Sequence, residues 1–335
     1  MLAGEYSYVI QNFFTEINPD QNQTEFSESG DPALTNKLEA GLPFSVLLVG
    51  LDYRESEHTR GRSDTLIVLT VNPTTADVKM LSIPRDTLIE LPGTEGPYET
   101  EGTYDKINST YAYGGIPYLS ETIESFFNIP IDFYATINFE GFADLIDAVG
   151  GITINSELEF SIKDETTGEM QHITEGVQHM NGKEALGYVR MRKEDPLGDW
   201  GRQQRQRQML EALIDEILTF ETVTNYTDVL NVIAPNLTTN VSLNQGYIIL
   251  NDYAQAASDI ETLELSGESN TRFFPHFGFE VYTYEVYNTA LAEIQNIFTN
   301  HLELEDYENN LNDNYDSLID GFPFYNDDAT DELNL

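Results

Sequence analysis

The sequence predicts an α/β protein in which helices cover both faces of a layered sheet. Short continuous apolar runs, such as residues 44–51, are typical of strands that are buried on both faces. Stretches with apolar residues at helical spacing alternate with these runs, and this alternation favours an α/β architecture. Of the 335 residues, 40% are hydrophobic and 11% are aromatic, which suffices for a packed core.

The amino-terminal half of the predicted fold begins with three strands, over residues 44–51, 66–71 and 78–83. Asn72-Pro73 lies between the second and third strands and is a turn signal. From residue 106 onward, helices and strands alternate. The expected elements are a short helix that stops at Gly114-Gly115, a second helix to residue 127, a strand over 132–138, a helix over 142–149 that stops at Gly150-Gly151, a hairpin over 152–173 and a helix from Asn181 to Arg190.

The carboxyl-terminal half is mainly helical. We expect a helix from Asp199 to residue 218, helical segments over 226–233 and 243–257, a strand over 260–265 and a helix over 287–301. The two ends differ in composition: residues 1–40 are polar and predict a tether, whereas residues 305–335 are acidic, contain no Lys or Arg and predict a disordered tail. The sequence therefore indicates one folded domain over residues 41–304.

The overall charge excludes several classes of partner. A formal charge of −42 argues against nucleic-acid, heparin or anionic-lipid surface binding by the whole protein, because each requires a positive field. All 16 Lys and Arg residues except Lys37 and Arg272 lie between Asp52 and Arg207. Adaptation to a habitat of high salt or high pH explains the general acidity, but it does not explain why the Lys and Arg residues cluster in this part of the chain. The chain has no cysteine, its five histidines have no metal-ligand spacing, and no window of about 18 apolar residues predicts a membrane span.

The stretch over residues 188–218 places arginines at the start of a predicted helix, where cations are unfavourable. Traced back from the apolar stripe of the helix that begins at Asp199, the inward face reaches Arg202, Arg205 and Gln206 in the first turns. The positive end of the helix dipole disfavours a cation there by about 0.3–1 kcal/mol. A phosphate at the helix start would explain the placement, because guanidinium groups bind it bidentately. The alternative is that these arginines pair with nearby acids such as Asp195 and Asp199.

Further charged residues fall at strand ends, where ligands bind in open α/β sheets. Asp52 follows the first strand, and Asp64 precedes the second; the two carboxylates would suit a hard divalent cation if these strands are neighbours. Metal and arginines together would neutralise charge during phosphoryl transfer. The arginines that we expect to converge on a diphosphate are Arg62, Arg85, Arg190, Arg192 and Arg202. No Walker or dinucleotide motif is present, and each aspartate taken alone also has a purely structural explanation.

Four segments together carry a family resemblance. GLDYRESEHTRGRSDTL, SIPRDT, KINSTYAYGG and YVRMRKEDPLGDWGRQQRQRQ, in this order and at these separations, resemble the LytR-CpsA-Psr family of cell-wall glycopolymer transferases. The resemblance runs from about Phe44 to Leu304 and is thinner after Gly267. The HFGFEVYTYEVY segment does not align, and the extreme acidity departs from the family pattern.

The resemblance implies an α-β-α sandwich with a central mixed sheet, on the extracellular face of the plasma membrane of Gram-positive-type bacteria. It also implies an N-terminal membrane anchor that this chain does not contain. Such enzymes move a glycopolymer, such as teichoic acid or capsule, from a polyprenyl-pyrophosphate carrier to peptidoglycan. By motif position, Asp52 and Asp64 would hold Mg²⁺ or Mn²⁺, and Asp199 would orient the arginines. The pyrophosphate would contact Arg62, Arg85, Lys106, Arg190, Arg192, Arg202 and Gln206.

The lipid part of such a carrier requires an apolar cavity beside the phosphates. Phe142, Leu145, Leu213 and Ile217 could line it, or they could belong to closed core. Two other functions stay open at this point: a non-catalytic binder of the lipid carrier or the wall, and a pyrophosphatase that uses water as acceptor. The catalytic base is not identified by the sequence.

Overall fold

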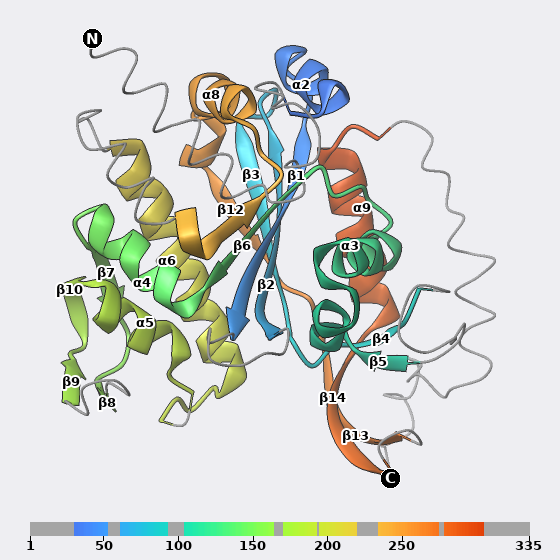
Figure 1. The fold of residues 1–335 in the computed structure, drawn as a ribbon. Coiled ribbons are helices and arrows are strands. Elements are labelled where there is room, and N and C mark those ends of the chain that lie inside the picture. Colours follow the sequence, from blue (N-terminus) through green and yellow to red (C-terminus); the bar gives the residue numbers. More distant parts are fainter. Residues whose placement is uncertain are drawn as a thin grey trace, which may run out of the picture.

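A six-stranded mixed sheet forms the centre of the molecule (Figure 1). The computed structural model describes residues 30–52, 61–92, 104–163, 170–192, 194–219, 234–274 and 278–304. In spatial order the strands are β11 (Leu237–Thr239), β6 (Phe133–Asn138), β1 (Phe44–Asp52), β2 (Arg62–Asn72), β3 (Asp77–Ile83) and β12 (Ile260–Leu263). β1 is parallel to β6 and antiparallel to β2, while β3 is antiparallel to β2 and parallel to β12. The predicted fold class is thus confirmed.

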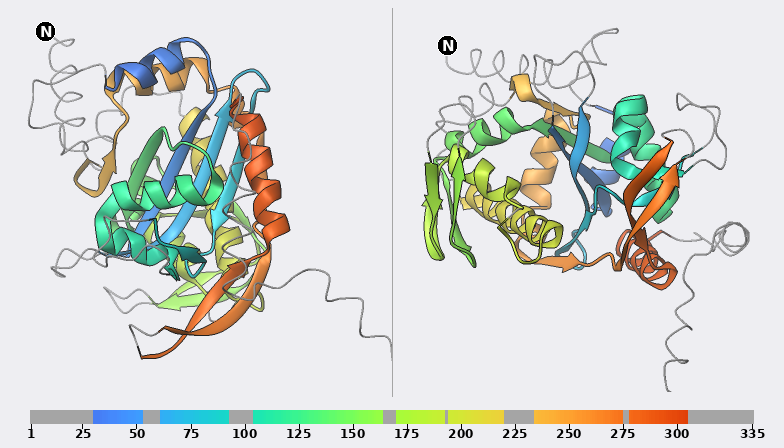
Figure 2. Two further views of the ribbon diagram at one scale, coloured as in Figure 1. Left: turned by 90° about the vertical axis from the view of Figure 1, so that its right-hand side faces the viewer. Right: turned by 90° about the horizontal axis from the view of Figure 1, so that it is seen from below.

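Both faces of the sheet are buried, as the unbroken apolar runs predicted. Leu47 and Val49 of β1 pack on the side covered by α3 (Ile107–Phe127) and α9 (Asn288–His301). Val46 and Leu48 point to the opposite side, where α2 (Pro32–Glu39), α8 (Leu243–Asp252) and part of α6 (Asp199–Thr219) contribute. Figure 2 shows helices on the two sides of the sheet. Because successive strand residues alternate between faces, two covered faces require a continuous apolar run.

A second core cluster lies beside the sheet. It is built from α4 (Phe139–Ala148), α5 (Gly182–Arg190), α6 and two small strand pairs, which are β7 (Ile152–Ser156) with β10 (Gly176–Met180) and β8 (Phe160–Lys163) with β9 (Met170–Ile173). The single hairpin predicted over residues 152–173 is therefore wrong in its pairing. β8 and β9 pair with each other inside this range, but β7 pairs with β10 beyond it. Alternation marks a strand, whereas tertiary burial selects its partner.

Glycines end or break the helices at the predicted positions. Gly115, inside α3, has φ 69° and ψ −154°, a conformation that is essentially restricted to glycine, and it divides the helix in two. Gly150 and Gly151 follow α4 with φ 92° and 87°. α5 begins with a capping box between Asn181 and Glu184.

Some elements were not predicted. Residues 32–39, which we assigned to the tether, form α2, and Leu38 of this helix is buried in the core. The other unpredicted elements are β4 (Leu88–Glu90), β5 (Tyr104–Lys106), β10, η3 (Ala234–Asn236), β11 and a hairpin of β13 (Gly267–Phe274) and β14 (Phe279–Val286). All of β14 thus lies within the HFGFEVYTYEVY segment. The helix expected over residues 243–257 is shorter than predicted, because α8 ends at Asp252 and the 3₁₀ helix η4 (Ala256–Ser258) follows it. The remaining tether (residues 1–29), the helix expected over 226–233 and the acidic tail lie outside the described residues. Within the described ranges, no helix is long and apolar enough to cross a bilayer.

Candidate active site at the carboxyl edge of the sheet

The predicted charged residues gather where β1, β3, β6 and β12 end, which we call the carboxyl edge. β1 ends at Asp52, whose Cα partner on antiparallel β2 is Arg62. The register shifts here, because Gly50 faces Thr65 while Leu51 faces Ser63, so Asp64 is the extra residue of a bulge. Asp52 and Asp64 therefore lie on neighbouring strands, which meets the condition stated in the sequence analysis.

Arg85 reaches this edge on a tight turn after β3. The Thr87 N–H and hydroxyl both donate to the carbonyl of Pro84, at 3.0 and 2.6 Å, and close the turn. Two outside groups fix it further: the Asn108 N–H donates to the carbonyl of Arg85 at 3.2 Å, and the Tyr284 N–H donates to that of Asp86 at 2.8 Å. The position of Arg85 thus depends on both α3 and β14.

Acidic neighbours hold the Arg85 side chain. Its Nη1 donates to Asp64 Oδ1 at 2.8 Å, and its Nε lies 3.6 Å from Asp86 Oδ2. Lys106 joins the same group, with its Nζ 2.8 Å from Asp86 Oδ1. Burial lowers the pKa of the Arg85 guanidinium, but Asp64, Asp86 and Asp199 together raise it more, so the net shift is upward.

The start of α6 brings Arg202 to the same group. Gly198, with φ 58°, and Asp195, which accepts from the Leu197 N–H at 2.7 Å, shape the loop before the helix. Arg202 is only 8% exposed, and its Nη2 lies 2.8 Å from Asp199 Oδ1 in an ion pair without hydrogen-bond geometry. Burial lowers the pKa of Arg202, and Arg85 and Arg192 lower it further, against the opposing effect of Asp199 and Asp64. An anion here would relieve this crowding of cations.

Arg205 has a different environment, which matches the ion-pair alternative. It is 5% exposed and forms a buried ion pair with Asp195. Its Nε donates to the carbonyl of Tyr188 at 3.0 Å, and its Nη2 donates to that of Met191. These bonds tie α6 to the end of α5, so we assign Arg205 to the structure rather than to a ligand.

Two buried donors in the arginine group have no hydrogen-bond partner among the described residues: Nε of Arg85 and Nε of Arg202. Buried polar groups in native proteins are nearly always satisfied, and an unsatisfied pair indicates a ligand or water. Guanidinium donors match the oxygens of a phosphate or diphosphate. The geometry therefore favours an oxyanion between β3 and α6.

The carboxylates of Asp52 and Asp64 stay the predicted ligands of a divalent cation. The described residues contain no group of three or more His, Asp or Glu side chains placed to hold a metal. Mg²⁺, however, commonly binds to one or two carboxylates together with substrate phosphates and water. Asp52 and Asp64 lie on neighbouring strands and would supply these carboxylates, with Asp64 Oδ1 also accepting from Arg85.

Membership of the remaining predicted residues in the site stays a prediction. Arg62, Arg190 and Arg192 are exposed, and Gln206 is half-buried one turn after Arg202. The Arg190 guanidinium carbon lies 4.6 Å from the centre of the Phe139 ring, a cation–π contact. Arg192 is near enough to affect the pKa of Arg202.

Sequence reasoning missed two contributors. Asp86 contacts both Arg85 and Lys106, although its position beside Arg85 in SIPRDT was a usable signal. Trp200 packs edge-on against Tyr284, with ring centroids 5.8 Å apart. This contact joins α6 to β14, and no sequence pattern indicates it.

The predicted lipid-contacting residues belong largely to the core cluster beside the sheet. Leu213 is 7% exposed in this cluster, and Phe142 and Leu145 pack against it half-buried, whereas Ile217 is 42% exposed. Leu213 is therefore a core residue, as the closed-core alternative predicted. A role of the other three in lipid binding stays a prediction.

Comparison with known proteins settles the family. The sequence pattern of the LytR_cpsA_psr family matches residues 7–300. The chain belongs to this family. It is 39% identical over 302 residues to polyisoprenyl-teichoic acid–peptidoglycan teichoic acid transferase TagU of Halalkalibacterium halodurans, covering 90% of this chain and 92% of that protein.

Solved structures of family members have the same fold. The crystal structure of TagV from B. subtilis superposes with a TM-score of 0.68 at 36% identity, over 78% of this chain and 98% of that one. A structure of TagT bound to LI-WTA gives a TM-score of 0.65 at 28% identity, over 84% and 95% of the two chains.

Proposed function

We propose that this protein is a phosphotransferase that moves a teichoic-acid-type glycopolymer from a polyprenyl-pyrophosphate carrier to peptidoglycan. The observation that carries the proposal is the pair of buried, unsatisfied Nε donors of Arg85 and Arg202 at the carboxyl edge. They provide a site for a diphosphate within an otherwise acidic molecule. The activity in the name of the relative TagU supports the same reaction.

In the proposed reaction, an acceptor hydroxyl of peptidoglycan attacks the sugar-side phosphorus of the carrier. A new P–O bond forms, the P–O bond to the bridging oxygen breaks, polyprenyl phosphate leaves, and the hydroxyl proton is released. Arg85 and Arg202 bind the diphosphate and neutralise the charge that develops on its oxygens. Asp64 and Asp199 hold the two guanidinium groups in place.

Asp52 and Asp64 are the residues that would hold a divalent cation, Mg²⁺ or Mn²⁺. Bound there, it would act as a Lewis acid toward phosphate oxygens. The carrier's lipid places the reaction at a membrane, and its peptidoglycan acceptor places it on the extracellular face. An N-terminal anchor, as in the resemblance described above, would keep the enzyme there.

Incubation with a lipid-pyrophosphate-linked glycan, with and without peptidoglycan fragments, tests the proposal. We expect polyprenyl phosphate to be released only when the fragments are present and the glycan to become linked to them. Release without the fragments would indicate a pyrophosphatase. Binding without any release would indicate a non-catalytic carrier-binding protein, and either result would contradict the proposed transfer.

A further inference from the structure

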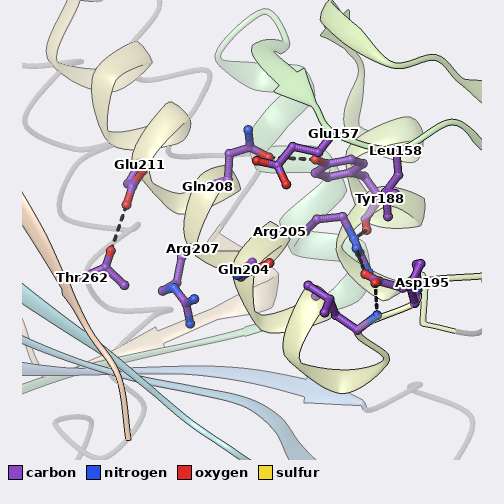
Figure 3. Close-up of a pocket in the computed structure, with 13 residues that line it drawn as sticks. Glu157, Leu158, Tyr188, Asp195, Gln204, Arg205, Arg207, Gln208, Glu211 and Thr262 are labelled. Atoms are coloured by element: carbon purple, nitrogen blue, oxygen red, sulfur yellow. Dashed lines mark hydrogen bonds and ion pairs between the residues drawn. The ribbon is translucent and has the colours of Figure 1, made fainter.

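A separate pocket of about 410 Å³ lies along α6 (Figure 3). This volume is within the usual range for small-molecule sites, roughly 300–1,000 Å³. Besides α6, the loop between β7 and β8, the loop before α6 and Thr262 of β12 contribute to its wall. Neither Arg85 nor Arg202, which mark the proposed diphosphate site, lines it.

α6 separates this pocket from the diphosphate site. At 3.6 residues per turn, Gln204 lies about 200° around the helix from Arg202. Gln204, Gln208 and Glu211 follow each other at intervals of four and three residues and line the pocket together. Arg202 and Gln206 lie on the other side of the helix.

The floor of the pocket is rigid because its polar groups bond to one another. The Tyr188 hydroxyl donates to Gln208 Oε1 at 2.7 Å, and Gln208 Nε2 donates to the carbonyl of Asn155 at 2.7 Å. The buried Arg205–Asp195 ion pair completes this floor. Gly201 is required beside it, because a Cβ at this position would lie 1.8 Å from Asp195 Oδ2. A preformed floor reduces the entropic cost of binding a ligand.

The rim of the pocket, in contrast, offers unused donors and acceptors. Within the described ranges, no hydrogen bond engages the side chain of Gln204, which is exposed, or that of Arg207, which is half-buried. Burial lowers the pKa of Arg207, against the opposing effect of Glu211 and Glu264. Glu157 supplies a carboxylate acceptor, and Glu211 supplies a second one, of which Oε1 already accepts from the Thr262 hydroxyl at 3.3 Å.

Charge and shape select the class of ligand. With Arg205 and Asp195 neutralising each other, Glu157 and Glu211 outnumber Arg207, so the lining disfavours an anion. One amide, the carboxylates and a guanidinium at the rim suit a ligand with closely spaced hydroxyl and amide groups. Leu158, Pro196 and Leu197 add an apolar wall for the carbon face of such a ligand.

We infer that this pocket is a saccharide subsite, which binds a neutral sugar unit of one of the two glycans joined in the proposed reaction. The inference rests on the proposed function for the identity of those glycans. α6 then carries diphosphate contacts on one side and sugar contacts on the other. A sugar in the pocket would align its glycan with the carboxyl edge of the sheet.

The test is calorimetric titration of the whole protein in saturating inorganic pyrophosphate with two probes. One is a soluble peptidoglycan glycan strand without stem peptides, and the other is a soluble teichoic-acid fragment. Gln204→Ala and Arg207→Gln remove rim contacts, and Gln255→Ala is the control, because Gln255 is another exposed glutamine, directly before η4 and outside the pocket lining. Melting temperatures verify that each variant is folded.

We expect one probe to bind and its Kd to rise about fivefold or more in both rim variants but not in Gln255→Ala. The probe that binds identifies the source of the sugar. Failure of both probes to bind the parent protein, or equal binding by parent and rim variants, would overturn the inference. Pyrophosphate binding and transfer from the lipid carrier are measured on the same samples. If only the saccharide inference fails, both remain intact. If the proposed function itself fails, both are absent.

Discussion

Arg202 and Arg205 lie one turn apart on α6, yet the structure gives them different roles. Arg205 is saturated by Asp195 and two carbonyls, whereas Arg202 keeps a buried Nε without a partner among the described residues. The sequence predicted that both side chains face inward, but it did not decide whether each binds a phosphate or pairs with a nearby acid. Only tertiary contacts decide which of two neighbouring arginines is available to a ligand.

Substitution of these two arginines should separate catalysis from stability. Arg202→Ala should lower transfer about 100-fold, the usual effect of losing a charge-stabilising donor, while the unliganded protein melts at the parent temperature or slightly above it. Arg205→Ala should cost about 3–5 kcal/mol, because it leaves the Asp195 charge buried and unpaired. Transfer assays and thermal melts of both variants check this. Marked destabilisation by Arg202→Ala would show that its role is structural.

The metal site also makes a prediction at single residues. Asp64→Asn should abolish Mn²⁺ binding, measured by electron paramagnetic resonance, and Mg²⁺-dependent transfer, since a carboxylate ligand is lost. The melting temperature should stay near that of the parent, because the amide oxygen still accepts from Arg85. Asp86→Asn is the matched control, as Asp86 also contacts Arg85 but is not on β1 or β2. Retained Mn²⁺ binding in Asp64→Asn would exclude the assignment.

At the scale of elements, strands and helix ends were predictable, and strand partners were not. β1, β2 and β3 followed from their apolar runs, and the break in α3 followed from Gly114-Gly115. In contrast, β7 pairs with β10, and β13 pairs with β14, without a sequence signal that names the partner. The parts of the candidate site that could be predicted are the charged residues next to the end of a strand or helix. The Trp200–Tyr284 contact was missed because it joins distant segments.

The break in α3 should depend on glycine. Gly115→Ala should lower the free energy of unfolding by about 1–3 kcal/mol, because a side chain is strained at this φ and ψ. Ser125→Ala, at an exposed position of the same helix, should change it by about 0.5 kcal/mol or less. Urea unfolding of the two variants provides the comparison. Equal stability of Gly115→Ala and the parent would mean that the chain straightens here without cost.

At the scale of the whole molecule, charge is distributed unequally. Residues 208–335 contain a single cation, Arg272, while the carboxyl edge collects most of the arginines that we assign to the site. Repulsion among the acids is long-ranged in dilute buffer and is screened by salt. The acidity therefore bears on the conditions under which the fold is stable and not on the chemistry of the site.

Stability should accordingly rise with salt. Screening shortens the range of repulsion from about 30 Å at 0.01 M to about 3 Å at 1 M. We expect the melting temperature to increase over this range both for the full chain and for a version that ends at Leu304, since the acids are spread along the sequence. A flat or falling melting temperature in both would contradict adaptation to a saline or alkaline habitat. An increase confined to the full chain would assign the effect to residues 305–335.

The central claim is that Arg85 and Arg202 together bind the diphosphate of the carrier. Calorimetric titration with a short-chain polyprenyl pyrophosphate, such as geranyl pyrophosphate, measures it directly. The Kd should rise at least about tenfold in Arg85→Ala and in Arg202→Ala, because each loses a charge-assisted hydrogen bond. It should be unchanged in Arg207→Gln, a variant on another side of α6. Parent affinity in both the Arg85 and Arg202 variants would contradict the claim.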